Sequence, residues 1–294
     1  MAVDMNLVRK LREQTGIGIL ECKKAMEAAN NDYALAEDTL RKKGYEKAKS
    51  KSSRATKEGV IASSLTAEGR TGLLLEMSCE TDFVAKNEDF RQMSQDILGI
   101  LARQATISSP EELLAHDAGE GVTVEKMVAE KIHKIGENLV VRRFVRVNTP
   151  EQGLVGTYVH TNGKIGVLVS AECDSAQTAS RGEVATLLKD VSMQVAALNP
   201  AYLNEKSIPA EAIEREKDIY REQMKNSGKP ANIIEKIVEG KMSKFYSESC
   251  LSHQAFFKDD SLTIQGLVEK TAKAVGGQIV LTGMIRYQVG EEQN

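Results

Sequence analysis

The sequence contains no tryptophan, and aromatic residues make up only 4% of its 294 residues. Proteins that bind single-stranded nucleic acid usually stack its bases on aromatic side chains, so direct binding of nucleic acid is not expected. No apolar run approaches the roughly 18 residues that a membrane-spanning helix requires. The amino-terminal residues MAVDMNLVRK also lack the features of a signal or transit peptide. We therefore expect a cytoplasmic protein without a membrane partner.

Cysteine and histidine are scarce and scattered. The four cysteines form no CxxC pair, so we expect reduced, mostly buried thiols and no disulfide framework. The four histidines form no HExxH or HxH pattern, and a metal site is not expected. The P-loop, the GxSxG nucleophile elbow and the GxGxxG fingerprint are also absent. The sequence therefore predicts no cofactor and no catalytic chemistry of its own.

Positive charge is concentrated in one stretch of a chain whose net charge is −3. Residues 41–57 carry eight Lys or Arg side chains against one Glu. Such a tract is either a solvated helix end that continues into a flexible linker, or an arm that binds RNA. We favour the linker because the acidic remainder of the chain opposes binding of phosphate.

The amino-terminal part has the pattern of three short helices. The sequence predicts one helix on each side of the TGIG sequence at residues 15–18. A third helix is predicted over Tyr33–Lys43, ending before Gly44. Three helices in about forty residues bury only a small core, and such modules are usually recognition units.

The remainder of the chain contains an internal duplication. Residues 59–79 align with residues 153–173 at a constant offset of 94, and each copy predicts a β-hairpin followed by a helix. Five pairs of positions are identical: Gly59/Gly153, Gly69/Gly163, Gly72/Gly166, Leu74/Leu168 and Cys79/Cys173. The helices are predicted over residues 89–104 and 182–198.

Each copy then closes with a strand, predicted over residues 138–147 and 278–287 at an offset of 140. The second copy is therefore longer by 46 residues, the difference between the two offsets. Two helices with apolar residues at three- and four-residue spacing are predicted there, over residues 208–224 and 231–245. Facing stripes of this kind are typical of a coiled-coil hairpin, which we expect to protrude and contact a partner.

These patterns predict an α+β fold. We expect a three-helix module and basic linker in residues 1–57. A first ββα…β lobe should occupy residues 58–150. A second, duplicated lobe should occupy residues 151–294, with the helical hairpin inserted at about residues 208–249.

The segment that follows the first hairpin, ETDFVAKN at residues 80–87, contains an Asp-Phe pair that its duplicate lacks. One interpretation is that Phe83 tucks back into the core, as phenylalanine usually does. The other is that the ring points outward, with Asp82 orienting the segment through turn or N-cap hydrogen bonds. Because the related segment has neither residue, we favour an outward ring.

Several phrases resemble the translation elongation factor Ts family, the guanine-nucleotide exchange factors of elongation factor Tu. They are LREQTGIGILECKKAM (residues 11–26), ETDFVAKN (80–87), KIGENLVVRR (134–143), HTNGKIGVLV (160–169) and SGKPANIIEKIVEGKM (227–242). The resemblance spans almost the whole chain, and the first two phrases together are highly specific.

The resemblance implies a partner and a mode of action. The three-helix module resembles the family's ubiquitin-associated type of module, which docks on the nucleotide-binding domain of the GTPase, here through Arg12, Ile19 and Leu20. The segment that dislodges the partner's Mg²⁺ matches Thr81, Asp82, Phe83 and Val84, with Phe83 as the wedge. His160 matches a contact position in the second lobe.

The implied function is that of a translation elongation factor in a bacterial type of cytoplasm. It would bind elongation factor Tu with GDP, displace Mg²⁺ and promote GDP release so that GTP can bind. An assembly with more than one copy of each chain is compatible with this function. Two alternatives stay open: an RNA-binding protein that uses the basic tract, and an adaptor that binds ubiquitin-like proteins through the helical module.

Overall fold

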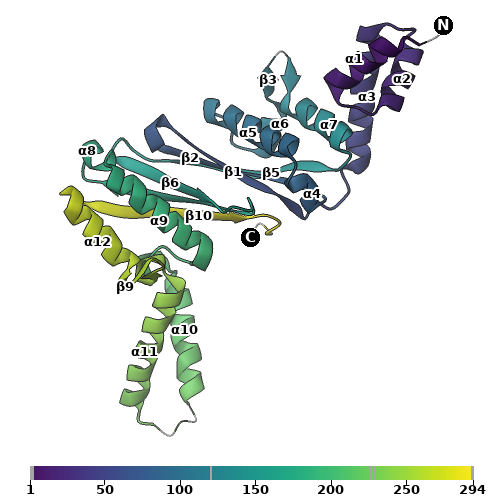
Figure 1. Ribbon diagram of the computed structural model, residues 1–294. Helices are drawn as coiled ribbons and strands as arrows, with labels where there is room; N and C mark the ends of the chain where they lie inside the picture. Colours follow the sequence, from purple (N-terminus) through teal and green to yellow (C-terminus); the bar gives the residue numbers. More distant parts are fainter. Residues whose placement is uncertain (1–2, 120, 226, 228, 293–294) are drawn as a thin grey trace.

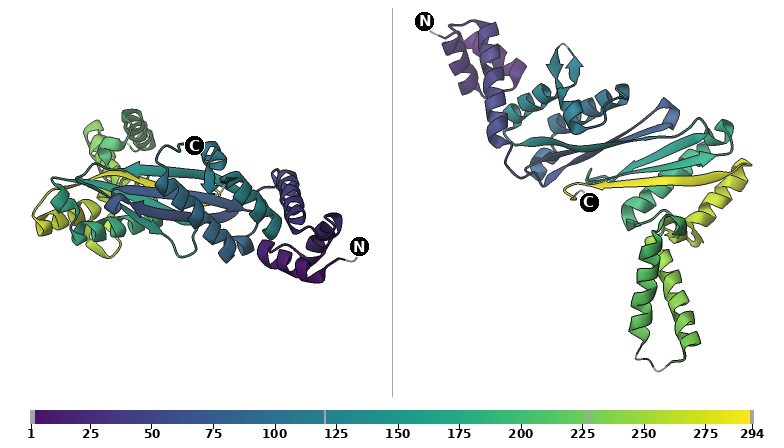
Figure 2. Two further views of the ribbon diagram at one scale, coloured as in Figure 1. Left: turned by 90° about the horizontal axis from the view of Figure 1, so that it is seen from above. Right: turned by 180° about the vertical axis from the view of Figure 1, so that it is seen from behind.

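The computed structural model describes residues 3–119, 121–225, 227 and 229–292, and its fold belongs to the α+β class (Figure 1). A three-helix head stands at one end of the molecule. Two three-stranded sheets with helices on their outer faces form the middle. A pair of long helices projects at the other end, as the views from above and behind also show (Figure 2).

The head consists of α1 (Met5–Thr15), α2 (Ile19–Ala28) and α3 (Tyr33–Lys51). Asp4 caps the start of α1 by accepting a hydrogen bond from the Asn6 N–H. Gly16 ends the helix with a left-handed backbone (φ 66°), as the predicted stop at TGIG requires. The core of the head is small and fully apolar, and it contains Val8, Leu11, Cys22, Met26 and Leu40.

The third helix is longer than predicted. The expected end before Gly44 is wrong, because α3 continues through Gly44 to Lys51. Gly44 is buried where α3 crosses α7 (Val124–Ile135), and a Cβ atom at this position would lie 3.4 Å from Nδ1 of His133. Gly44 therefore lies inside the contact between the two helices, and α3 continues past it because it packs against α7. As a consequence, the first part of the basic tract is helical, and the linker shrinks to residues 52–57.

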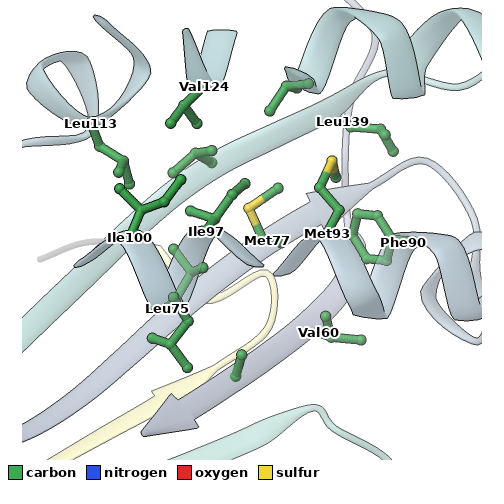
Figure 3. Packing of buried hydrophobic residues seen from close by; sticks show 14 of the residues in the cluster. Val60, Leu75, Met77, Phe90, Met93, Ile97, Ile100, Leu113, Val124 and Leu139 are labelled. Carbon is green, nitrogen blue, oxygen red and sulfur yellow. The ribbon is translucent and has the colours of Figure 1, made fainter. Parts of the chain in front are cut away.

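The first lobe is built on an antiparallel sheet in the order β1-β2-β5. Its strands are β1 (Glu58–Thr66), β2 (Thr71–Cys79) and β5 (Leu139–Asn148), with a 3-10 turn at Ala67–Gly69. Three helices cover one face: α5 (Glu88–Arg103), α6 (Pro110–Ala115) and α7. Figure 3 shows the core between them, where Leu75 and Met77 of β2 pack with Phe90, Met93 and Ile97 of α5.

The second lobe has the same topology. Its strands are β6 (Gly153–Val159), β7 (Ile165–Cys173) and β10 (Ile279–Gln288), in the order β6-β7-β10. The covering helices are α9 (Gly182–Leu198) and α12 (Ile264–Val275). In both lobes the second strand of the hairpin is central, and the closing strand pairs with it.

The duplication extends to elements that the sequence analysis did not predict. A single helical turn precedes the long helix in each lobe, α4 (Asp82–Ala85) in the first and α8 (Ala176–Ala179) in the second. A small strand pair precedes the last helix in each lobe. These pairs are β3 with β4 (Asp117–Gly119, Val122–Thr123) and β8 with β9 (Ala255–Phe256, Asp259–Thr263).

The two sheets meet through an apolar interface that has internal symmetry. Its buried residues are Ile61, Leu74, Val155 and Leu168. A Cβ atom on Gly72 would lie 2.6 Å from Val155 and 3.0 Å from Leu168. A Cβ atom on Gly166 would lie 2.4 Å from Ile61 and 3.2 Å from Leu74. The two sets of contacts are equivalent, since they are related by the offset of 94 between the copies. Two of the identical pairs in the repeat, Gly72/Gly166 and Leu74/Leu168, therefore take part in this close approach.

The projecting pair of helices is α10 (Ala210–Met224) and α11 (Ala231–Ser249), with short 3-10 turns at Glu205–Ser207 and Leu251–His253 near its base. Val238 and Met242 of α11 are buried. Arg221 of α10 pairs with Glu235 of α11 at 2.9 Å. Asn226 and Gly228, which belong to the connection expected between these helices, lie outside the described residues.

Candidate functional site

Phe83 lies on α4, the single helical turn that directly follows β2. Its side chain is 80% exposed, whereas the next two residues, Val84 and Ala85, are buried in the core of the first lobe. The turn is therefore anchored by two apolar side chains, and the aromatic ring points away from the core. A large apolar side chain with this exposure is unusual, since phenylalanine is normally among the most buried residues.

The equivalent turn of the second lobe, α8, shows that the fold does not require this ring. Both turns have a hydroxyl residue as their amino-terminal cap, Thr81 in α4 and Ser175 in α8. The position equivalent to Phe83 is Gln177, which is also exposed. The same backbone element therefore carries a polar residue in one copy and an aromatic residue in the other.

Two glutamates fasten α4 to the turn before β5. The Glu137 carboxylate accepts hydrogen bonds from the Thr81 N–H (3.0 Å) and from its hydroxyl (2.6 Å). The Glu80 carboxylate accepts a hydrogen bond from the Asn138 N–H (2.6 Å). Both phrases stand out in the sequence, but their contact was not predicted. No sequence pattern connects them, because the contact depends on the register in which β2 pairs with β5.

Asp82 does not orient the segment in the way that we expected. Thr81 caps the turn, with its hydroxyl 3.4 Å from the Val84 N–H. The Asp82 carboxylate instead forms an ion pair with Lys86 at 2.7 Å, and this hydrogen bond lowers the pKa of Asp82. The expected turn or N-cap hydrogen bond to the Asp82 carboxylate was wrong, because Thr81, directly before it, occupies the N-cap position.

His160 lies in the turn between β6 and β7 of the second lobe. It is exposed, and Nδ1 of its ring is 3.0 Å from the Tyr158 hydroxyl. The same turn reaches the first lobe, because the Gly163 carbonyl accepts a hydrogen bond from the Ile61 N–H at 2.7 Å.

A second contact places this turn at the end of the first hairpin that leads to α4. Lys164 forms an ion pair with Glu58, which pairs with Cys79 at the end of β2. Lys86 chiefly, and Lys164 in addition, lower the pKa of Asp82. The structure therefore brings the His160 turn and α4 to the same end of the two-lobe core.

The three predicted docking residues of the head lie together. Arg12 on α1 and Ile19 on α2 line the same shallow depression beside Gly16. Leu20 follows directly and is 72% exposed. The result is an apolar patch with a basic edge, and we call these three residues (Arg12, Ile19 and Leu20) the head patch. It belongs to the head, whereas α4 belongs to the first lobe (Figure 1).

Much of the basic tract forms the joint between the head and the first lobe. Arg41 pairs with Glu130 of α7 at 3.3 Å, and Lys51 donates to the carbonyl of Gly136. Lys47 pairs with Glu21 of α2 at 2.5 Å, and the same carboxylate lies 2.8 Å from Nε2 of the buried His133. Arg54 is 3.4 Å from Glu80. Half of the eight basic side chains therefore have a protein acceptor, which reduces the charge available to a phosphate backbone.

Cysteine chemistry plays no part in this site. All four cysteines are buried and unpaired, and burial raises the pKa of Cys79 to about 12. Within the described residues, no group of three or more His, Cys, Asp or Glu side chains is placed to hold a metal ion. None of the helices in the described part of the chain is long and apolar enough to cross a membrane.

Comparison with known proteins gives one consistent result. The family model described as "Elongation factor TS" matches residues 80–291. The elongation factor Ts of a Nitratiruptor species is 45% identical over 291 residues, which cover 99% of this chain and 94% of the relative. The elongation factor Ts of Trichlorobacter lovleyi is 43% identical over 293 residues, which cover 99% of this chain and 94% of the relative. That of Desulfovibrio desulfuricans is 41% identical over 292 residues, which cover 99% of both chains. The chain, with its duplicated lobes, helical head and exposed Phe83, belongs to the elongation factor Ts family of translation factors.

Proposed function

We propose that this chain is a guanine-nucleotide exchange factor that acts on elongation factor Tu in the cytoplasm. It binds the GTPase with GDP, displaces Mg²⁺ from the nucleotide site of the GTPase and promotes GDP release so that GTP can bind. Membership of the family supports the partner and the class of activity. The observation that carries the mechanism is the exposed Phe83 on a turn whose counterpart has Gln177 in the same position.

Exchange of this kind needs no acid, base or nucleophile. In a GTPase, phosphate-loop amides and Mg²⁺ hold the nucleotide. A factor speeds release when it binds the nucleotide-free GTPase better than the nucleotide-bound form, since equal affinity for both shifts nothing. The coupling is reciprocal, so incoming nucleotide also expels the factor.

The free energy of burying one aromatic ring is large enough to accelerate GDP release. Each tenfold gain in release rate needs about 1.4 kcal/mol of preferential stabilisation of the opening transition state. Transfer of an exposed phenylalanine into an apolar gap beside the nucleotide supplies on the order of 2–3 kcal/mol. We propose that Phe83 acts as this wedge and that the partly exposed Asp82 enters the same region beside the metal.

A wedge works only if its support does not yield. Thr81 is held through two hydrogen bonds to Glu137, and Val84 is buried behind the ring. A force that the GTPase exerts on Phe83 is therefore borne by the core of the first lobe. In a flexible loop, the same force would displace the ring instead.

Docking requires contacts away from the wedge. We propose that the head patch binds the nucleotide-binding domain of the GTPase, and that His160 and the α10–α11 hairpin provide further contacts. Contacts at well-separated places hold the GTPase in position while one turn distorts its nucleotide site. The elongated arrangement of head, lobes and hairpin suits this task (Figure 2).

The test is the release of labelled GDP from purified elongation factor Tu in the presence of the full chain and excess unlabelled GDP. We expect the release rate to rise with factor concentration and to saturate. A factor that binds the GTPase in calorimetry yet leaves the release rate at its spontaneous value would contradict the proposed function.

A further inference from the structure

A β-bulge occurs at the same place in both lobes, but only one bulge carries charged residues. In the first lobe, Glu76 of β2 pairs with Arg143 of β5, and Arg142 is the extra residue. The equivalent positions in the second lobe are Ser170, Gly283 and Thr282. The Ser170 and Thr282 hydroxyls bond to each other within the second lobe at 3.0 Å. The charges are therefore not needed to form the bulge or the sheet.

Glu76 is fully buried, and it lies on the face of β2 that packs against the second lobe. Its carboxylate accepts a hydrogen bond from Arg143 at 2.6 Å and another from the backbone N–H of Gly290 at 3.0 Å. Gly290 is the second residue after the closing strand of the second lobe. A buried carboxylate of one lobe thus holds the backbone of the other.

Arg143 completes the connection. Its guanidinium group lies over the ring of Tyr287, 4.1 Å from the ring centre, and donates to the carbonyl of Gln288 at 3.1 Å. The bond from Arg143 to Glu76 keeps both charges paired inside the interface, where an unpaired charge would be costly. We refer to Glu76, Arg143 and the segment 287–290 as the clasp.

The two copies differ at both the donor and the acceptor position of the clasp. Position 290 is equivalent to position 150 at the offset of 140, and residue 150 is a proline, which has no N–H to donate. The acceptor has changed as well, from Glu76 to Ser170. The symmetry-related pair, Ser170 and Pro150, therefore has neither the carboxylate nor the donor, although the apolar part of the interface is symmetric.

We propose that Glu76 and Arg143 are positioning residues for nucleotide exchange. They fix the angle between the lobes, and with it the distance between Phe83 on the first lobe and the partner contacts on the second. This inference rests on the proposed function. Glu76 lies on the strand that leads directly into α4, so a loose clasp would let the lobes turn when Phe83 meets resistance. The GTPase would then still bind, but its nucleotide site would be distorted less.

The test compares Glu76→Gln with wild type and with the matched variant Ser170→Ala in the second lobe. We expect Glu76→Gln to lower the rate of GDP release at saturating factor about tenfold, while its affinity for nucleotide-free elongation factor Tu falls less than about threefold. Ser170→Ala should change neither value. Arg143→Lys, which keeps the charge but loses the planar fork and the stacking, serves as a second variant if Glu76→Gln does not fold.

A structural measurement on the same proteins keeps the inference independent of activity. Spin labels on cysteines introduced at the exposed positions Gln92 of α5 and Lys189 of α9 report the distance between the lobes, since the native cysteines are buried. We expect a broader distance distribution in the clasp variants than in wild type. An unchanged distribution in a folded variant overturns the inference, and so does an equal loss of rate and affinity. If the wild-type factor does not accelerate GDP release from elongation factor Tu, the proposed function is wrong. The role of the clasp in exchange is then wrong as well.

Discussion

Phe83 and Gln177 occupy the same position of the same helical turn in the two lobes, and both side chains are exposed. The turns have equivalent caps and equivalent buried residues, so the fold places no demand on this position. Contacts inside the folded chain therefore do not account for the exposed aromatic ring in the first lobe. Contact with a partner is the explanation from which the first prediction follows.

We expect Phe83→Ala to slow GDP release from elongation factor Tu at saturating factor by tenfold or more, roughly the value of burying one phenylalanine. Complex formation should weaken far less, because the other contacts remain. The matched control is Gln177→Ala, which truncates the equivalent side chain. Stopped-flow release rates that are the same for both variants would rule out the wedge.

The head patch leads to a prediction about affinity. Because Leu20 is 72% exposed, Leu20→Ala should change the free energy of unfolding by no more than about 0.5 kcal/mol. If the patch docks on the GTPase, the same variant should weaken binding about tenfold, as expected for a leucine that becomes buried. Leu35→Ala, at another exposed leucine of the head, is the control in calorimetry. Equal affinities for the two variants would remove the head patch from the interface.

The interface between the lobes predicts an effect on stability. In Gly72→Ala the new methyl group would lie 2.6 Å from Val155, so we expect a loss of about 1–3 kcal/mol in the free energy of unfolding. Gly240→Ala, within α11, meets no atom within 4 Å and should be neutral or stabilising by up to about 1 kcal/mol. Denaturation by urea measures both. A Gly72→Ala protein as stable as wild type would mean that the sheets are not packed this closely.

The joint between head and first lobe predicts a dependence on pH. Hydrogen bonds from Lys47 and then His133 lower the pKa of Glu21 from its ordinary value of 4.5. A carboxyl group with a lowered folded pKa stabilises the fold above pH 4.5, and this contribution is lost as the pH falls through the folded value. Thermal midpoints should therefore be higher for wild type than for Glu21→Gln near pH 7, and the difference should shrink below about pH 4.

Glu27→Gln is the matched control for this measurement, since Glu27 on the same helix forms its ion pair within the head, with Lys23 at 3.7 Å. Its thermal midpoint should follow that of wild type across the pH range. A difference between wild type and Glu21→Gln that stays constant down to about pH 3 would contradict the assigned role of the carboxylate.

Local patterns explain why much of the fold could be predicted from the sequence. The bounds of α9 are those expected from the periodicity, and both hairpins follow from a strand, a glycine-containing turn and an apolar second strand. Gly44 misled the prediction of α3, because a glycine at a helix end and a glycine at a helix crossing look alike in one sequence. Contacts with a distant helix decided between them.

Part of the candidate site could also be predicted from the sequence, and part could not. The Asp-Phe segment could be found because a duplicated sequence offers an internal comparison. The hydrogen bonds that Thr81 donates to Glu137 and Gly290 donates to Glu76 could not be found, and the latter joins residues 214 positions apart. Buried polar pairs of this kind leave no periodic pattern, and only the three-dimensional register of the strands brings them together.

The symmetric interface between the sheets bears on how such a chain could arise. Two separate copies of such a half could associate as a homodimer with a twofold axis. In that dimer, a leucine of each copy would pack against the glycine of the other. Joining them in one polypeptide makes the association independent of concentration. In one polypeptide the two halves need not be identical, so one carries an outward ring and a buried carboxylate where the other carries glutamine and serine.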